Sequence, residues 1–393
     1  MMTRARTPGI ILALTLCLMA VGLTMVYSAS ANKASGQKRA VLKKTDPEAY
    51  AHYFNYHDPY YLRRQALFAA LGLAAMLALG SFDHHRLRRL APWLLAGTFV
   101  LLCLVFFPPL GRRANGASRW IGLGPFNFQP SEAAKLVMVI YMARMLVNRQ
   151  RVIGSFREGV VPASAITAVF CFIILIEPDF GTAAILAAVV FLLWFIAGMR
   201  LLHLAALVFM VTPLAVLAIL THPHMLQRVL DLLDFWSHDM TGHKQLLQSV
   251  IAVASGGLTG RGIGCSIQKY AFLPEAHTDF IFAVMAEELG FIRSVLVILV
   301  FLALIIMGWR VALRASDTFG GYLASGVTLL LALSVSLNLL VVLGCLPPKG
   351  MALPFMSYGG SSMLVNCAAI GILINVAKYN ALSDQPIPRR QGR

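Results

Sequence analysis

Ten stretches of predominantly apolar residues recur along the chain, separated by polar segments. A helix needs roughly 20 such residues, with a range of about 17–25, to cross a bilayer. The stretches cover approximately residues 9–28, 65–82, 90–107, 132–147, 159–176, 181–199, 201–221, 279–308, 319–345 and 361–377. The fourth is short and carries charge, and residues 198–200 are interpreted as a tight turn between the sixth and seventh. The pattern predicts an all-α polytopic membrane protein with about ten transmembrane helices.

The longest polar segments lie at residues 29–64 and 222–278. We expect one transmembrane domain over residues 1–380, with residues 222–278 as a large extracytoplasmic loop between the seventh and eighth spans. Within that loop, the pattern predicts an amphipathic helix on the membrane surface at residues 224–236 and a second helix at 244–254. Residues 381–393 are expected to form a polar cytoplasmic tail.

Composition agrees with this assignment. Hydrophobic residues make up 58% of the 393 residues, charged residues only 13%, and mean hydropathy is +0.73. Soluble domains are about 25% charged, so the soluble enzyme folds are excluded. A net charge of +16 would suggest nucleic acid in a soluble protein, but basic residues at membrane edges set topology and meet anionic lipid. We therefore expect membrane lipids, and no nucleic acid, as partners.

The six cysteines form no CxxC pair, and four of them lie in apolar runs. Cysteine behaves there as a small hydrophobic residue, so the sequence indicates neither a disulfide framework nor a zinc site.

The first apolar stretch resembles a signal peptide, because Arg4 and Arg6 precede it and small residues follow at 28–31. Its apolar run of about 19 residues exceeds the 7–15 of a signal peptide, so we expect an uncleaved first helix. Lys and Arg residues in the short loops gather on the side of the N-terminus. The positive-inside rule therefore places both termini in the cytoplasm.

Charged residues at membrane depth are rare and usually functional. Pro130 suits the first turn of a helix, and Glu132 and Lys135, three residues apart, share one face of it. One interpretation is a neutralised pair that lets a helix end lie in lipid. The other is a polar lining, together with the preceding Arg119 and Trp120, for an anionic substrate. Trp120 alone would suit an interfacial anchor.

Two further polar stretches have strong structural interpretations. Residues 177–182 suit a tight turn in which Asp179 or Thr182 caps the next helix. The glycines of 256–264 do not indicate a nucleotide-binding loop, because no strand precedes them. Backbone amides there, with Arg261, could still contact a phosphate-bearing lipid.

Asp279 lies at the predicted outer mouth of the eighth span. We expect Thr278 to cap a helix that starts near Asp279, and capping is the alternative role for Asp279 itself. The grouping of Glu275, His277 and Asp279 at a membrane edge favours a functional site.

Lys349 and Ser357 belong to an irregular segment, residues 346–362, before the last span. Irregular backbone near a membrane is tolerated where it packs on protein or lines a cavity. A simple hinge is the alternative interpretation of this segment.

In this order, the motifs RWIxLG, QPSExxK, EPDFGT, SGGxxGxGxGxSxQK, LPEAHTDFIFA, EELG and LPFxSYGGSS resemble those of the SEDS family of cell-wall polymerases. The resemblance covers nearly the whole chain. LPEAHTDF, with Lys349-Gly350 further on, is most similar to the division branch of the family, with the elongation branch second. Pro348 stands where a threonine is usual, and the 29–64 segment is longer and more basic than is typical.

This resemblance implies a peptidoglycan glycosyltransferase that polymerises lipid II, an undecaprenyl-pyrophosphate-linked disaccharide peptide, at the outer face of the cytoplasmic membrane during septal wall synthesis. It implies Asp279 as the catalytic base and importance for the positions of Trp120, Glu132 and Lys135. Further candidate supporting residues are Arg119, Arg261, Glu275, His277, Lys349 and Ser357. The implied protein partners are a class B penicillin-binding protein transpeptidase of the FtsI type and other membrane proteins of the division machinery.

The chemistry suits these residues. An acceptor 4-hydroxyl loses its proton as it attacks the donor's anomeric carbon, and an aspartate can accept that proton. The leaving pyrophosphate needs cations, for which Lys135, Arg119, Arg261 or a divalent ion such as Mg²⁺ or Mn²⁺ are candidates. Direct attack implies inversion, from an α-linked donor to a β-1,4 product.

Two other functions remain open at this point. A lipid II flippase would also use polar groups such as Glu132 and Lys135, but it needs them through the depth of the membrane. A non-enzymatic scaffold for the division machinery gives no reason to place Glu132, His277 and Asp279 where burial is costly.

Overall fold

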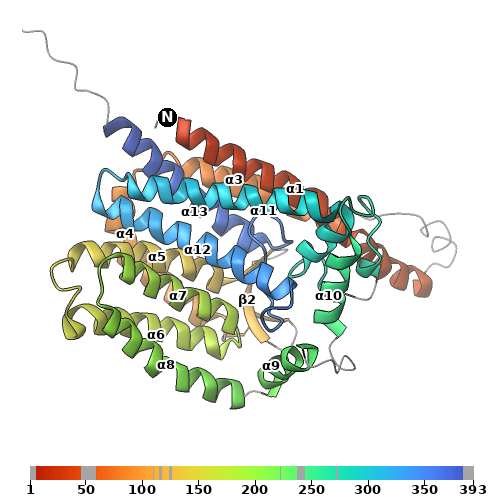
Figure 1. The fold of residues 1–393 in the computed structure, drawn as a ribbon, viewed down its shortest axis with the longest axis horizontal. Helices are drawn as coiled ribbons and strands as arrows, with labels where there is room; N and C mark the ends of the chain where they lie inside the picture. The colour runs from red at the N-terminus through yellow and green to blue at the C-terminus, as the bar shows by residue number, and fades with distance from the viewer. Residues whose placement is uncertain are drawn as a thin grey trace, which may run out of the picture.

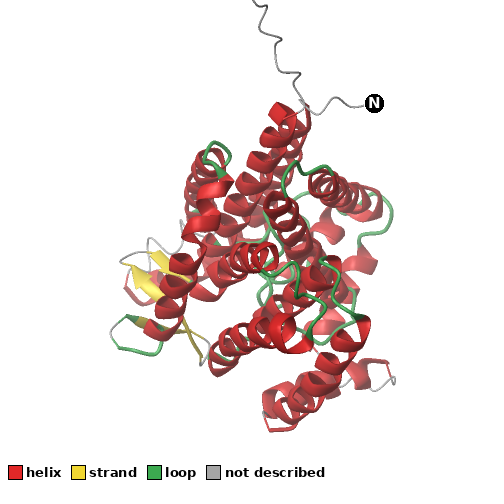
Figure 2. Cartoon of the chain, turned by 90° about the vertical axis from the view of Figure 1, so that its left-hand side faces the viewer, coloured by secondary structure: helices red, strands yellow, loops and turns green. Residues whose placement is uncertain are grey.

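The computed structural model describes residues 6–45, 59–108, 110–114, 117–123, 126–221, 223–236, 244–270 and 273–383. Long helices run roughly along one axis, and the shorter elements β2, α9 and α10 gather toward one end (Figure 1). A view turned by 90° shows a helical body with a small sheet at its edge (Figure 2). The all-helical membrane fold predicted from the apolar pattern is confirmed in its essentials.

Each of the ten predicted spans coincides with a helix. These helices are α1 (Thr7–Thr45), α3 (Tyr60–Leu79), α4 (His84–Leu104), α5 (Pro130–Asn148), α6 (Val161–Ile176), α7 (Phe180–Ile196), α8 (Leu201–Thr221), α11 (Ile281–Leu313), α12 (Thr318–Val342) and α13 (Gly360–Ser383). Within the described residues, seven are long and apolar enough to cross a bilayer, and α5, α7 and α8 are not among these seven. The total of ten spans therefore stays a prediction.

Helix α1 continues well beyond its apolar part, to Thr45. The sequence pattern had assigned residues 29–64 to a loop, which is wrong for residues 29–45. Alanine, lysine, glutamine and arginine dominate this stretch, and they are good helix formers. Hydropathy marks where the apolar surface ends, not where the helix ends.

A three-stranded antiparallel sheet interrupts the helical pattern between α4 and α5. It consists of β1 (Gly111–Ala114), β2 (Ala117–Leu123) and β3 (Phe126–Phe128). β2 lies in the middle and pairs with both neighbours. The sequence pattern does not predict this sheet, because its strands are short and pair only with one another.

The predicted long loop contains both expected helices, α9 (Pro223–Trp236) and α10 (Lys244–Ser255). The indole N–H of Trp236 donates to the carbonyl of Gly344 at 3.1 Å and fixes the end of α9 near the end of α12. α10 packs against α11, so the loop folds back onto the helical body.

Helix α11 is broken at Gly290, where φ is +79° and ψ is 176°. The broken backbone pairs with the glycine-rich segment: N–H groups of Arg261 and Gly262 donate to the carbonyls of residues 287 and 288, and carbonyls of 257 and 258 accept from residues 291 and 292. A Cβ at Gly290 would meet the backbone of Gly260 at 2.2 Å. Both the left-handed φ and this close approach require glycine.

The core lies around α12 and α13. α12 packs against α5, α7, α11 and α13, and α13 packs along α3. The buried share of the apolar part is 67% in α12 and 72% in α13, against 39% or less in the other five long apolar helices. These two central helices connect the two ends of the molecule.

Candidate active site

A polar cavity of about 460 Å³ lies where the sheet, the turn before α7, α9, α11 and the loop before α13 meet. Seven of the ten predicted site residues line it, namely Arg119, Trp120, Glu132, Lys135, Glu275, Asp279 and Lys349. Residues separated by more than two hundred positions in the chain are thus brought together, as expected for one site.

Glu132 and Lys135 form the predicted pair within the first two turns of α5. Lys135 Nζ lies 2.8 Å from Glu132 Oε1, and the two side chains are only 10% and 12% exposed. Pro130 occupies the start of the helix, where its missing N–H costs no hydrogen bond. The second carboxylate oxygen of Glu132 has no partner among the described residues, and both side chains line the cavity.

Arg119 joins the sheet to the turn before α7. Its guanidinium donates to the carbonyls of Glu177 at 2.8 Å and Pro178 at 2.6 Å. Asp179 then caps α7, as predicted, by accepting from the N–H and the hydroxyl of Thr182. This clamp brings the Asp179 carboxylate to the cavity wall.

Asp279 lies in the turn directly before α11. That helix begins at Ile281, and Thr278 donates its hydroxyl to Glu275 rather than capping the helix, so the predicted cap is wrong. Asn338 of α12 is buried, and its amide donates to the carbonyls of Asp279 at 3.0 Å and Met351 at 2.7 Å. One side chain therefore holds the Asp279 turn against the loop that carries Lys349.

The cavity environment changes the acidity of its groups. Burial, and next the negative charge of Glu275, raise the pKa of Asp279 to about 7. Burial lowers the pKa of Lys349, against the opposing effect of Asp179. A carboxylate that titrates near neutrality, facing an open cavity, suits a general base.

Four cations line the cavity, but they differ in their partners. Lys135 is neutralised by Glu132, and Arg119 is occupied by the two carbonyls. Arg228 of α9 and Lys349 make no ion pair or hydrogen bond within the described part of the chain. These two cations are therefore available to a ligand.

The remaining three predicted residues lie outside the cavity lining. His277 is buried, its ring contacts Tyr61 and Tyr358, and its carbonyl accepts from the N–H of Tyr358 at 3.0 Å. Ser357 accepts from the N–H of Leu353 at 2.7 Å within its loop. Both residues support the cavity wall from behind.

Arg261 and two buried glutamates hold the glycine-rich segment, residues 256–264, in place. Arg261 lies 3.5 Å from Glu287, which also accepts from the Ser266 hydroxyl at 2.5 Å. Glu288 pairs with Lys269 at 2.8 Å, and Ser28 of α1 donates to it. Both glutamates are fully buried. This cluster fixes the segment that leads to Asp279.

Sequence reasoning missed several residues of the cavity. Asp179 was interpreted only as a helix cap, and Arg228 was one polar residue of an amphipathic helix, which gave no specific signal. Asn338 did carry a signal, because an amide inside a predicted apolar span needs a hydrogen-bond partner.

A divalent ion in the cavity would have few protein ligands. Among the described residues, no three His, Cys, Asp or Glu donor atoms approach one another there closely enough to hold one ion. Two carboxylates of the cavity wall, Glu275 and Asp279, are only four residues apart in the chain. Mg²⁺ is commonly held by one or two carboxylates together with substrate phosphates, so the site fits an ion that arrives with a phosphate ligand.

The fold and the cavity define a polytopic membrane protein. At one end of its helical body, the cavity combines a carboxylate whose pKa is about 7 with two cations that have no partner among the described residues. The cell cycle protein family that comprises FtsW, RodA and SpoVE matches residues 9–382. The chain belongs to this family.

Named relatives match over nearly the full length. Stage V sporulation protein E of Bacillus subtilis (strain 168) is 38% identical, over 97% of this chain and 100% of that protein. A probable peptidoglycan glycosyltransferase FtsW of Geobacter metallireducens is 40% identical, over 94% of each chain.

Solved structures are similar as well. A chain in a peptidoglycan synthase complex that coordinates polymerization and crosslinking has a TM-score of 0.74 at 27% identity, covering 94% of this chain and 97% of that one. Rod shape determining protein RodA of Thermus thermophilus has a TM-score of 0.65 at 27% identity, covering 94% and 95%.

Proposed function

We propose that this chain is a peptidoglycan glycosyltransferase that polymerises lipid II into glycan strands. The observation that carries the proposal is the cavity, whose lining combines Asp279, with its pKa of about 7, and the cations Arg228 and Lys349, which have no ion pair within the described part of the chain. Relatives named peptidoglycan glycosyltransferase FtsW, about 39% identical over 94% of the chain, support the same activity.

The proposed step is a direct displacement. Ionised Asp279 accepts the proton of the acceptor sugar's 4-hydroxyl while that oxygen bonds to the donor's anomeric carbon. The bond from this carbon to the pyrophosphate breaks, and its electron pair leaves on the phosphate oxygen. One displacement inverts the configuration, which turns an α-linked donor into a β-1,4 linkage.

We assign the leaving pyrophosphate to Arg228 and Lys349, since Arg119 and Lys135 already have partners. We expect Lys349→Met and Arg228→Met each to slow polymerisation by about tenfold to a hundredfold, because charge developing on the phosphate loses a cation. Polymerisation rates of purified variants measure this. Lys349→Arg should recover part of the rate, and Arg293→Gln, a cation outside the cavity lining, should leave it unchanged. Wild-type rates for both methionine variants would exclude this assignment.

The acidity of Asp279 predicts a pH profile. The base must be ionised, so the polymerisation rate should rise with pH through about 7 and then level off. Glu275→Gln removes a negative charge that raises the pKa of Asp279, so the midpoint of this rise should move to lower pH. Initial rates across the pH range test both points. An unmoved midpoint would mean that Glu275 does not act on the base.

We also propose where this protein acts and which protein it binds. We infer that the cavity opens at the outer face of the cytoplasmic membrane and that a class B penicillin-binding protein docks nearby during septal synthesis. The similar chain from a complex that couples polymerization to crosslinking supports such a partner. A flippase would need polar groups through the membrane, whereas the lining of this cavity comes from the end of the molecule that holds the sheet, α9 and the start of α13.

Native cysteines test the orientation. Cys265 and Cys345 are exposed near the cavity end, so both should react with a membrane-impermeant maleimide in intact spheroplasts. Serine at both positions should remove this labelling. A cysteine introduced at Gln385, which lies outside the described residues, should then react only after permeabilisation, because we expect a cytoplasmic tail. Labelling of that cysteine in intact spheroplasts would reverse the orientation.

The decisive experiment gives purified protein lipid II, with and without its transpeptidase. Formation of glycan strands would support the proposed function, whether the protein acts alone or together with a transpeptidase that cannot itself polymerise lipid II. Transport of lipid II across a vesicle membrane, with no glycan polymer formed, would instead identify a flippase. If neither polymerisation nor transport is observed, a scaffold is the remaining interpretation.

A further inference from the structure

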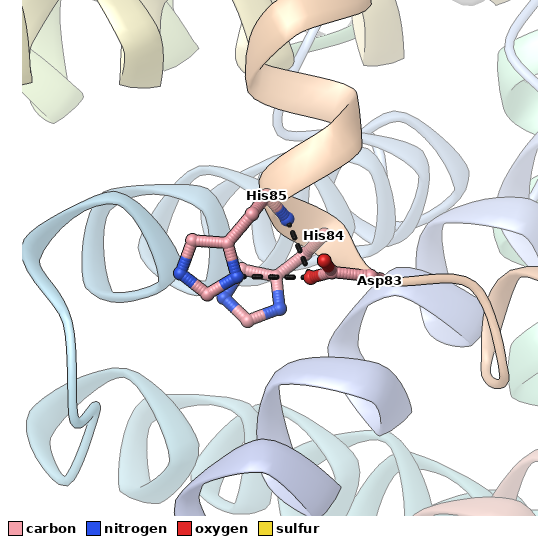
Figure 3. Close-up of side chains that lie close together, drawn as sticks. All are labelled: Asp83, His84 and His85. Atoms are coloured by element: carbon pink, nitrogen blue, oxygen red, sulfur yellow. Dashed lines mark hydrogen bonds and ion pairs between the residues drawn. The ribbon is translucent and has the colours of Figure 1, made fainter.

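A second polar cluster lies at the end of the helical body opposite the cavity. Asp83, His84 and His85 stand at the start of α4, and Asp317 caps the start of α12 (Figure 3 shows the first three). Donor atoms of Asp83, His84 and His85 lie within 4.8 Å of one another. His84 is buried at 1% exposure, while the His85 and Asp83 side chains are 40% and 50% exposed. The cluster is therefore built into the body but open to water.

Each histidine is fixed by an acceptor at Nδ1. His84 Nδ1 lies 2.9 Å from Asn375 Oδ1, and the same oxygen accepts the backbone N–H of His84 at 3.2 Å. His85 Nδ1 lies 2.9 Å from Asp83 Oδ1, which likewise accepts the backbone N–H of His85. Because both oxygens act as acceptors, both Nδ1 atoms carry the hydrogen. In the neutral rings, each Nε2 then presents a lone pair.

Both Nε2 atoms face one carboxylate. His84 Nε2 lies 3.1 Å from Asp317 Oδ1, and His85 Nε2 lies 3.9 Å from Asp317 Oδ2. Two ligand atoms bound to one tetrahedral ion at roughly 2.0–2.1 Å are about 3.3 Å apart, so the first separation is close to the required value, whereas the second, to the other carboxylate oxygen, must shorten when the ion binds. Histidine ligands of metals characteristically donate their other ring N–H to a carboxylate or carbonyl, which is the arrangement found at both rings here.

We propose that His84, His85 and Asp317 bind a divalent transition metal ion, with Asn375 and Asp83 orienting the two imidazoles. Two imidazoles and a carboxylate suit Zn²⁺, with solvent completing the coordination on the exposed side.

The ion would join the ends of α4 and α12, and through Asn375 it would also hold α13. Ser334 of α12 and Ser361 of α13 line the cavity at the other end of these helices. The proposed ion is therefore structural, and it is distinct from any ion that accompanies a phosphate in the cavity.

The test uses full-length protein purified in detergent without a histidine tag and stripped with a chelator. Titration with Co²⁺ should give one equivalent of bound ion with the visible absorption of a tetrahedral site, and Zn²⁺ should displace it and raise the melting temperature. His85→Gln, at a half-exposed position, should lose both effects. Asp83→Asn should weaken binding by about 10- to 100-fold, as expected for a residue that orients a ligand. His203→Gln is the matched control and should behave like the wild type.

Two results would overturn the proposal. The first is a wild-type protein that binds no Co²⁺, in which case a protonated His84 simply bridges Asn375 and Asp317 as an ion pair. The second is Co²⁺ binding that His85→Gln leaves unchanged, which would place the ion elsewhere.

Discussion

Asp279→Asn is expected to lower lipid II polymerisation by roughly 10² or more, the scale of general-base catalysis. Asparagine keeps the size of the side chain, and the hydrogen bond from Asn338 goes to the backbone carbonyl, so it survives the change. Only the proton-accepting charge is lost. The rate of glycan formation by purified protein measures this effect.

The controls separate chemistry from folding. Asp279→Asn should insert in the membrane, bind its transpeptidase and still bind lipid II. Glu275→Gln should be milder at high pH, because it lowers the pKa of Asp279 but leaves the Asp279 carboxylate in place. Near wild-type polymerisation by Asp279→Asn would refute the mechanism and leave Glu132 as the next candidate base.

Glu288→Ala is expected to destabilise the protein by about 3–5 kcal/mol, because it leaves the buried ammonium of Lys269 without its counter-charge. Ser28 and the backbone N–H of Ser266 lose their acceptor as well. Thermal unfolding in detergent should show a markedly lower melting temperature and poor accumulation in membranes.

The matched variants define what this pair contributes. Glu158→Ala removes an exposed carboxylate and should change stability by no more than about 0.5 kcal/mol. The double change Glu288→Leu with Lys269→Met removes both charges and should be less harmful than Glu288→Ala alone. Equal melting temperatures for Glu288→Ala and the wild type would show that the pair does not hold the loop.

Local patterns predicted the helices and part of the site. Apolar runs of the right length located all ten helices, and the spacing of three residues predicted the contact between Glu132 and Lys135. Asp179 caps α7 because its side chain reaches amides only three residues ahead. Each of these features depends on residues close together in the chain.

Tertiary contacts decided the features that were missed. Thr278 does not cap α11, because Glu275 offers its hydroxyl a nearer acceptor and the helix starts two residues later than expected. Arg228 reaches the cavity only because α9 folds back over it. The sheet that carries Arg119 depends on pairing between short strands, for which composition gives little signal.

The break in α11 separates Asp279 mechanically from the long apolar part of the helix. Residues 281–289 form a short helix next to Asp279, while the long apolar part of α11 follows Gly290. Two backbone hydrogen bonds join this short helix, at residues 287 and 288, to Arg261 and Gly262, and two more join residues 291 and 292 of the long part to residues 257 and 258. A tilt of the long part of α11 therefore does not reach Asp279 along one continuous helix. We therefore expect a protein that binds residues 256–262 to move Asp279 more readily than a protein that contacts only the long part of α11.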